Sequence, residues 1–143
     1  MEVLSEWICD SCGETVKQPK AYVIWKRNEN GLAYGFKIIH QKDCDNDDYP
    51  SSGSIDQFLG LDGEAKLLCF LSSGPLKADK ERKGSIRVAD IDEFVDFFRR
   101  VQTPFYEEAR TKFFNEDVFD RFSDASEVRP YMSDALQSIV NEY

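Results

Sequence analysis

The first forty residues carry the apolar pattern of β-strands. Ala21–Arg27 (AYVIWKR) and Tyr34–His40 (YGFKIIH) are runs of aromatic and β-branched residues, the types that are enriched in strands. Asn28, Asn30 and Gly31 lie between these runs and tolerate the positive φ angles of a tight turn. The pattern therefore predicts a β-hairpin.

A polar segment and then a helical pattern follow the hairpin. Residues 43–54 are rich in Asp, Ser, Pro and Gly and have no apolar period, which is typical of a linker. Ser54 and Gln57 have the spacing of a capping box and predict a short helical turn. Asp62 is then expected to cap a second helix that ends near Leu71.

The strongest helical signal lies in the second half of the chain. The charged loop 77–87 leads to a short expected strand at 86–88, after which Asp90 caps a helix and Glu93 completes a second box. The expected apolar face of this helix is Ile91, Phe94, Val95, Phe98 and Val101.

Three shorter helical segments are expected to complete the chain. Thr103 and Pro104 have the form of an N-cap followed by a proline at the first helical position. A short helical piece is expected at 118–122, and Ser133 is expected to cap the last helix. The fold class is therefore α+β, with a small β lobe over residues 1–46 and a mostly helical lobe over residues 54–143. The two lobes can pack as one compact domain.

Charge narrows the classes of partner. The net charge of the 143-residue chain is −9, and residues 43–143 hold twelve basic and twenty-two acidic residues. This excess of carboxylates repels polyphosphate and disfavours nucleic acid as a partner. The first residues lack the basic and apolar segments of a signal peptide, and the longest apolar run, Leu67–Leu71, is too short to span a membrane. We therefore expect an acidic cytoplasmic protein without contact to membranes.

Four residues have the spacing of metal ligands. Cys9 and Cys12 form a C-x2-C pair followed by glycine, and His40 and Cys44 form an H-x3-C pair. The predicted hairpin brings the two pairs together, and the only histidine of the chain stands where a fourth ligand is needed. Three thiolates and one imidazole are typical of a closed, structural Zn²⁺ site. We expect one structural zinc ion per chain.

Residues 7–44 resemble the zinc-ribbon family through the motifs CDSCG and HQKDC. The resemblance implies two knuckles on a β-hairpin framework that share one zinc ion. The second knuckle departs from the more common C-x2-C pattern, and a treble clef is similar except that its second ligand pair lies on a helix. No family is matched to the remaining hundred residues.

Other interpretations of the cysteines are weaker. Without an export signal, the thiols are expected to stay reduced rather than pair as a disulfide. A redox C-x-x-C would follow a strand and open a helix, and the sequence after Cys12 does not predict a helix. Cys69, in the run LLCFL, is expected to be a buried core thiol rather than a ligand.

The sequence offers little for catalysis. Once His40 is assigned to the metal, no histidine remains for a nucleophile–base pair, and none of the common nucleotide-binding or metalloprotease motifs is present. We expect a non-enzymatic regulator or adaptor that acts through protein–protein contacts. The alternative is a protein that binds nucleic acid through the ribbon face, where Trp25, Lys26, Arg27 and Lys37 form the candidate recognition surface.

Overall fold

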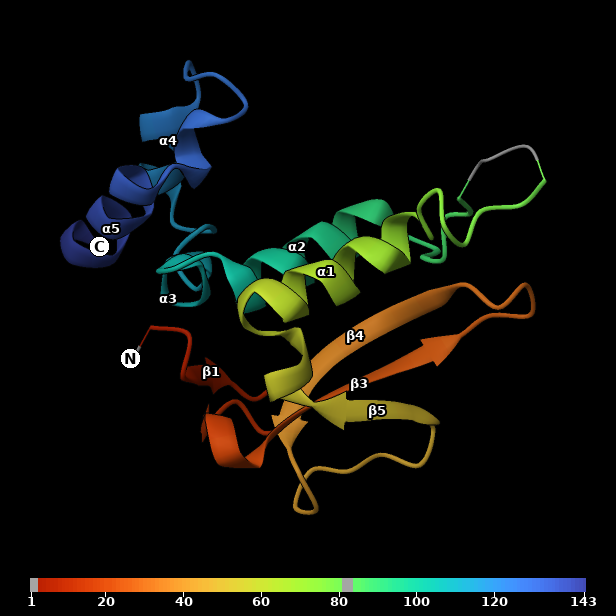
Figure 1. Ribbon diagram of the computed structural model, residues 1–143. Helices are drawn as coiled ribbons and strands as arrows, with labels where there is room; N and C mark the ends of the chain where they lie inside the picture. Colours follow the sequence, from red (N-terminus) through yellow and green to blue (C-terminus); the bar gives the residue numbers. More distant parts are fainter. Residues whose placement is uncertain (1–2, 81–83) are drawn as a thin grey trace.

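Two small antiparallel sheets form the β part of the computed structural model, which describes residues 3–80 and 84–143 (Figure 1). Strand β1 (Glu6–Ile8) pairs with β2 (Thr15–Lys17). In the second sheet, β3 (Ala21–Arg27) lies between β4 (Ala33–His40) and β5 (Ser51–Ser54). The hairpin expected from the sequence is therefore confirmed as β3–β4.

The expected linker is partly wrong, because its last four residues form an edge strand. Tyr22 pairs with Ser54 and Trp25 with Ser51 in the antiparallel register of β3 and β5. Strand β5 consists of serines and one glycine, so no apolar alternation marks it. Its position is fixed by backbone hydrogen bonds to β3, which no local pattern reveals.

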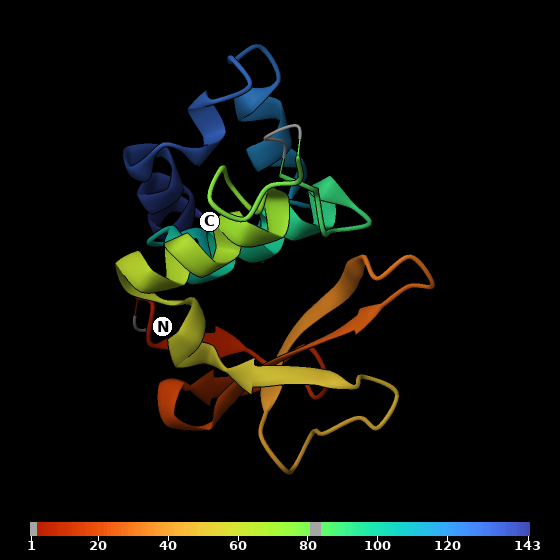
Figure 2. The same ribbon diagram turned by 45° about the vertical axis from the view of Figure 1, so that its right-hand side comes forward.

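Five α-helices lie in the described part of the chain. They are α1 (Gly60–Leu71), α2 (Ile91–Gln102), α3 (Tyr106–Arg110), α4 (Glu116–Phe122) and α5 (Ser133–Glu142), with 3-10 turns η1 (Gln18–Lys20), η2 (Ile55–Phe58) and η3 (Arg129–Tyr131). Helices α1 and α2 cover one face of the three-stranded sheet, whereas α4 and α5 lie away from it (Figures 1 and 2). The α+β class is confirmed.

Several expected helix caps are wrong. Asp62 lies inside the first turn of α1, which begins directly after Leu59. Thr103 ends α2 instead of starting the next helix, and α3 begins after Phe105, which has a left-handed backbone. Ser133 is already the first residue of α5. The observed caps are Leu59, Phe105 and Met132, so the local cap signals are displaced by one to three residues.

Asp90 is the confirmed cap of α2, but the Glu93 side chain, expected to complete the capping box, binds strand β4 instead. The Asp90 carboxylate accepts a hydrogen bond from the Glu93 backbone N–H at 3.2 Å. The Glu93 carboxylate accepts from the backbone N–H groups of Gly35 and Phe36 in β4. These groups lie where the register of β3 and β4 shifts, so Glu93 satisfies donors that the irregular ladder leaves free.

The buried face of α2 is rotated from the expected one. Phe94 and Val101 are buried as predicted, together with Phe97 and Arg100, while Ile91 is 48% exposed. The aromatic rings between the helices and the sheet are Trp25, Phe36, Phe58, Phe70, Phe94 and Phe97. Stacking of Phe97 on Phe36, with 4.9 Å between ring centroids, selects this rotation.

A second, smaller core lies among α3, α4 and α5. Tyr106, Val118, Leu136 and Ile139 are buried in it. None of the residues of this second core comes from a strand, so it is built by the C-terminal helices themselves.

Two further expectations need correction. Cys69 is exposed on α1 instead of buried, because the helix turns Leu67 and Phe70 toward the core. Of the expected strand at 86–88, only Val88 makes a bridge, to Ala33. Part of the charged loop that precedes it, residues 81–83, lies outside the described residues. Within the described ranges, no helix is long and apolar enough to cross a membrane.

Gly63 permits the close contact between α1 and the turn before it. A Cβ atom at Gly63 would lie 2.2 Å from the Phe58 carbonyl carbon, a backbone atom that cannot move independently. We expect Gly63→Ala to lower the free energy of unfolding by about 1–3 kcal/mol or more. The matched control Glu64→Ala, at an exposed position of the same turn, should change it by less than about 0.5 kcal/mol. Urea denaturation measures both, and equal stability of the two variants would contradict this packing constraint.

Candidate metal centre

The first pair of candidate ligands lies in the tight connection of β1 and β2. The Cys9 N–H donates to the Glu14 carbonyl at 2.8 Å, and the Gly13 N–H donates to the Cys9 carbonyl at 2.9 Å. Gly13 has a φ angle of +79°, which glycine adopts without a steric penalty. The chain therefore reverses within a few residues, and both sulfurs point to the same side.

The second pair closes a turn at the end of β4. His40 is the last residue of the strand, and the Cys44 N–H donates back to the His40 carbonyl at 3.1 Å. Lys42, inside the turn, has a φ angle of +72°. A non-glycine residue in this conformation is uncommon. The hydrogen bond from Cys44 to His40 closes the turn around it.

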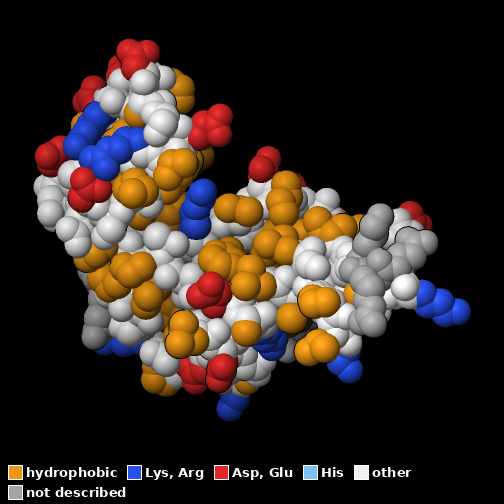
Figure 3. All heavy atoms as spheres, turned by 45° about the horizontal axis from the view of Figure 1, so that its top comes forward, with side chains coloured by type: hydrophobic (Ala, Val, Ile, Leu, Met, Phe, Trp, Pro, Cys, Tyr) orange, Lys and Arg blue, Asp and Glu red, His pale blue; other side chains and the backbone are white. Residues whose placement is uncertain are grey.

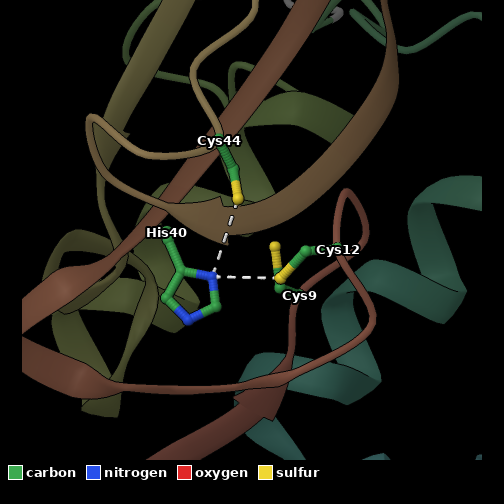
Figure 4. A group of neighbouring side chains, drawn as sticks. All are labelled: Cys9, Cys12, His40 and Cys44. Atoms are coloured by element: carbon green, nitrogen blue, oxygen red, sulfur yellow. Dashed lines mark hydrogen bonds between the residues drawn. The ribbon is translucent and has the colours of Figure 1, made fainter.

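The four donors surround a single point (Figure 4). The His40 Nδ1 atom lies 3.5 Å from the Cys12 sulfur and 3.8 Å from the Cys44 sulfur. All four donor atoms, including the Cys9 sulfur, lie within 4.8 Å of one another. In a tetrahedral Zn²⁺ site, bonds of about 2.0–2.3 Å place neighbouring donors about 3.5–3.8 Å apart. The two distances from Nδ1 to sulfur match this spacing, and the four residues lie close enough together to bind one metal ion.

A contact behind the histidine fixes which nitrogen faces the cluster. The His40 Nε2 atom lies 3.1 Å from the Thr15 carbonyl in β2. A carbonyl only accepts, so Nε2 carries the proton and Nδ1 presents its lone pair to the cysteines. This outer hydrogen bond is the usual support of a metal-bound imidazole.

The cysteines differ in their readiness to ionise. Burial raises the pKa of Cys9, but backbone N–H groups, first those of Cys12 and Ser11, outweigh it and lower the pKa to about 6. The pKa of Cys44 is raised by desolvation and by the nearby sulfurs of Cys9 and Cys12. Several thiolates at such short distances repel one another, and a cation between them removes that repulsion.

A buried ion-pair network lies directly behind the first ligand pair. Asp10, between Cys9 and Cys12, accepts a hydrogen bond from Arg100 at 2.7 Å. Arg100 is 3% exposed and also donates to both oxygens of Glu107, with its shortest contacts at 2.8 Å. The Nη2 atom of Arg100 also donates to the Ile8 carbonyl at 3.1 Å. Helix α2 therefore reaches the knuckle through one side chain.

The backbone around Arg100 completes this network. The indole N–H of Trp7 donates to the Arg100 carbonyl at 2.8 Å, and the Ile8 N–H donates to Glu107. Burial alone would lower the pKa of Arg100, but Glu107 and then Asp10 raise it above its ordinary value. The guanidinium therefore stays charged in the interior and needs both carboxylates.

The residues considered for a recognition surface do not share one face. Trp25 is 7% exposed and packs among the rings of the core. The ammonium groups of Lys26 and Lys37 lie 4.6 and 5.2 Å from the centre of the Tyr49 ring, and Arg27 is exposed at the end of β3. Recognition by these cations stays a prediction.

Comparison with known proteins adds no relative. No protein-family model, no curated protein and no solved structure matches the chain.

Sequence reasoning missed the supports of the cluster. Asp10, Thr15, Arg100 and Glu107 belong to no spacing motif. One weak signal was available, because Arg100 follows Phe97 by three residues and therefore lies on the same helix face. An arginine near a helix C-terminus is usually solvated, which conceals its buried role.

Removal of the Arg100 side chain tests the network. Arg100→Met should lower the free energy of unfolding by about 3–5 kcal/mol, because two buried or half-buried carboxylates lose their counter-charge. Arg100→Lys should not restore stability, since one ammonium cannot replace the planar guanidinium that joins both acids. Urea denaturation of the metal-loaded protein gives the values.

The neighbouring arginine serves as the control. Arg99 is half-buried and lies over the Tyr131 ring, so Arg99→Met should cost about 1 kcal/mol or less. An Arg100→Met variant as stable as Arg99→Met would show that the network does not hold the knuckle to the helices.

Proposed function

We propose that Cys9, Cys12, His40 and Cys44 bind one structural Zn²⁺ ion and that the protein acts through contacts with other proteins. The observation that carries the first part is the placement of four protein donors within 4.8 Å of one another. Sulfur and imidazole donors in this ratio suit Zn²⁺ better than the oxygen-seeking ions Mg²⁺ and Ca²⁺.

The ligand number supports a structural role. Catalytic zinc sites keep one position open for water or substrate, whereas four protein ligands complete a tetrahedron. Binding of the ion then contributes to the folding free energy of the segments that supply the ligands. We propose no catalytic activity, and the residues of the cluster act only to bind metal and to join the two hairpins.

A role as a small cytoplasmic regulator or adaptor would explain the apolar side chains that the protein exposes. Several large apolar side chains are exposed, among them Leu61, Phe114 and Phe119. Apolar side chains that gather on one face mark sites for partners. The alternative, nucleic-acid binding through Lys26, Arg27 and Lys37, has the net charge of −9 against it. A mobility shift that weakens steeply with salt would favour this alternative over protein contacts.

Metal analysis tests the zinc site. We expect one zinc ion per chain in protein purified without added metal, and an X-ray absorption spectrum with three sulfur neighbours and one nitrogen neighbour. His40→Ala should lose most of the metal. Cys69→Ser is the matched control, because Cys69 is an exposed cysteine outside the cluster, and it should retain the metal. Zinc bound with an additional oxygen neighbour would contradict the closed site.

Removal of the metal by a chelator tests whether the ion holds strand β1 in place. In a Trp25→Phe background, Trp7 is the only tryptophan; it is fully buried in β1, and its indole N–H binds the Arg100 carbonyl. Removal of zinc should shift Trp7 emission to longer wavelength, because β1 loses the ligand turn that follows it. The far-UV circular dichroism should change modestly, since the second core contains no ligand. Unchanged Trp7 emission after complete chelation would show that the ion does not hold β1.

A further inference from the structure

The C-terminal helices leave a hollow that their own side chains do not fill. It has a volume of about 410 Å³ and is lined mainly by apolar groups, including Phe113, Phe119, Phe122 and Tyr131. A second hollow of about 380 Å³ shares Phe113 and Phe119 with the first. The two hollows adjoin at these side chains, and we name them together the α4 groove. Its volume is in the range of sites that accept ligand groups.

The aromatic side chains at this groove are unusually exposed. Phe119 is 70% exposed and Phe114, which lines the second hollow, is 96% exposed. Neighbouring Val118 and Ile139 are buried in the second core, so the local fold is complete without these two rings. Large apolar groups that remain in water beside a formed core are available to a partner.

The rim of the α4 groove is acidic. Glu116 and Asp120 line it directly, and residues 113–143 hold seven acidic and two basic residues. Both basic residues pair within the chain, Arg121 with Glu142 and Arg129 with Asp134. Figure 3 shows acidic side chains around the outer edge of the projecting α4 region, with Lys and Arg side chains between them and hydrophobic ones toward the rest of the molecule.

The rings of the groove already attract cations within the chain. The Arg99 guanidinium lies 3.9 Å from the centre of the Tyr131 ring, and that of Arg121 lies 5.1 Å from the centre of the Phe122 ring. An aromatic face beside carboxylates favours Lys or Arg over neutral groups. These two rings are already covered by cations, so the carboxylates of Glu116 and Asp120 are the groups of the groove that would attract a further positive charge.

This charge decides among the possible occupants. A second copy of the chain would bring an identical acidic rim against the first, and an anionic membrane or a nucleic acid would be repelled. A segment with an apolar face and flanking lysines or arginines satisfies both the rings and the carboxylates. An amphipathic helix presents such groups at positions i, i+3, i+4 and i+7 and binds apolar grooves in this way.

We propose that the α4 groove binds a basic amphipathic helix of a partner protein. The inference rests on the proposed function in protein contacts and gives the chemistry of the partner. Phe119 and Phe114 receive its apolar face, while Glu116 and Asp120 pair with its cations.

A designed peptide tests the proposal on the full-length, zinc-loaded protein. The probe is a fluorescein-labelled helix of about 18 residues, made of leucine on one face and lysine on the other. Its counterpart keeps the leucines and replaces each lysine by glutamate. Fluorescence anisotropy should show binding of the lysine peptide, weaker at high salt, and no binding of the glutamate peptide.

Matched variants locate the site. Phe119→Ser and the pair Glu116→Lys/Asp120→Lys should each weaken binding about tenfold. Leu76→Ser and Glu64→Lys are the controls, because Leu76 is 94% exposed in a loop and Glu64 is exposed on α1; both should bind as the wild type does. All five substituted positions are exposed, and circular dichroism verifies that each variant is folded.

Other outcomes overturn the proposal in distinguishable ways. Equal binding by wild type and Phe119→Ser would place the peptide elsewhere and reject the α4 groove, while protein contacts as the proposed function would stand. Binding of the glutamate peptide, of anionic vesicles, or self-association that Phe119→Ser abolishes would reject the basic occupant. Failure to bind the lysine peptide together with salt-sensitive RNA binding would reject the groove and the proposed function alike.

Discussion

The buried guanidinium of Arg100 is the interaction on which the arrangement of the molecule depends. It connects helix α2 to the β1 strand and the adjoining knuckle, about ninety residues away in the sequence, through Ile8 and Asp10, and to the following helix α3 through Glu107. An arginine in the interior is unfavourable unless its charge and its donors are satisfied. Because these acceptors come from separate elements, the charge is satisfied only when the β1 hairpin and the helices occupy their observed positions, which makes this contact a source of specificity as much as of stability.

The metal cluster and this network meet within four residues of the chain. Asp10 stands between Cys9 and Cys12, and its carboxylate also accepts from the Ile38 N–H in β4 at 2.8 Å. A metal ion that fixes the two cysteines therefore also fixes the carboxylate that Arg100 needs. Binding energy gained from an ion at these residues would support the docking of α2, although none of the four residues lies on a helix. With an ion bound, the cluster and the aromatic core would stabilise the same interface from two sides.

Local signals predicted the elements whose physical cause is local. The β3–β4 hairpin, the Asp90 cap and the two ligand pairs each depend on a few adjacent residues, and all were visible in the sequence. Strand β5, made of serines and one glycine, exists through its neighbour β3. Arg100 belonged to an apparently solvated helix end, and the side chain of Glu93, expected to complete a capping box, instead satisfies a bulge in β4. These features arise from contacts across the chain, which periodicity and spacing cannot reveal.

Positive and negative charge are concentrated in different parts of the molecule. The Arg100 guanidinium is buried in the ion-pair network, and the ammonium groups of Lys26 and Lys37 lie over the Tyr49 ring. Negative charge collects around the α4 groove, beyond the reach of the metal cluster. Since the second core contains no metal ligand, the groove does not need the ion for its own packing. Helix α3 connects the groove to the network, since it carries both Glu107 and Tyr106 of the second core, and the contact of Arg99 in α2 with the Tyr131 ring is a second connection. Binding of a partner at the groove would therefore be coupled to the metal centre through α3 and through the contact between Arg99 and Tyr131.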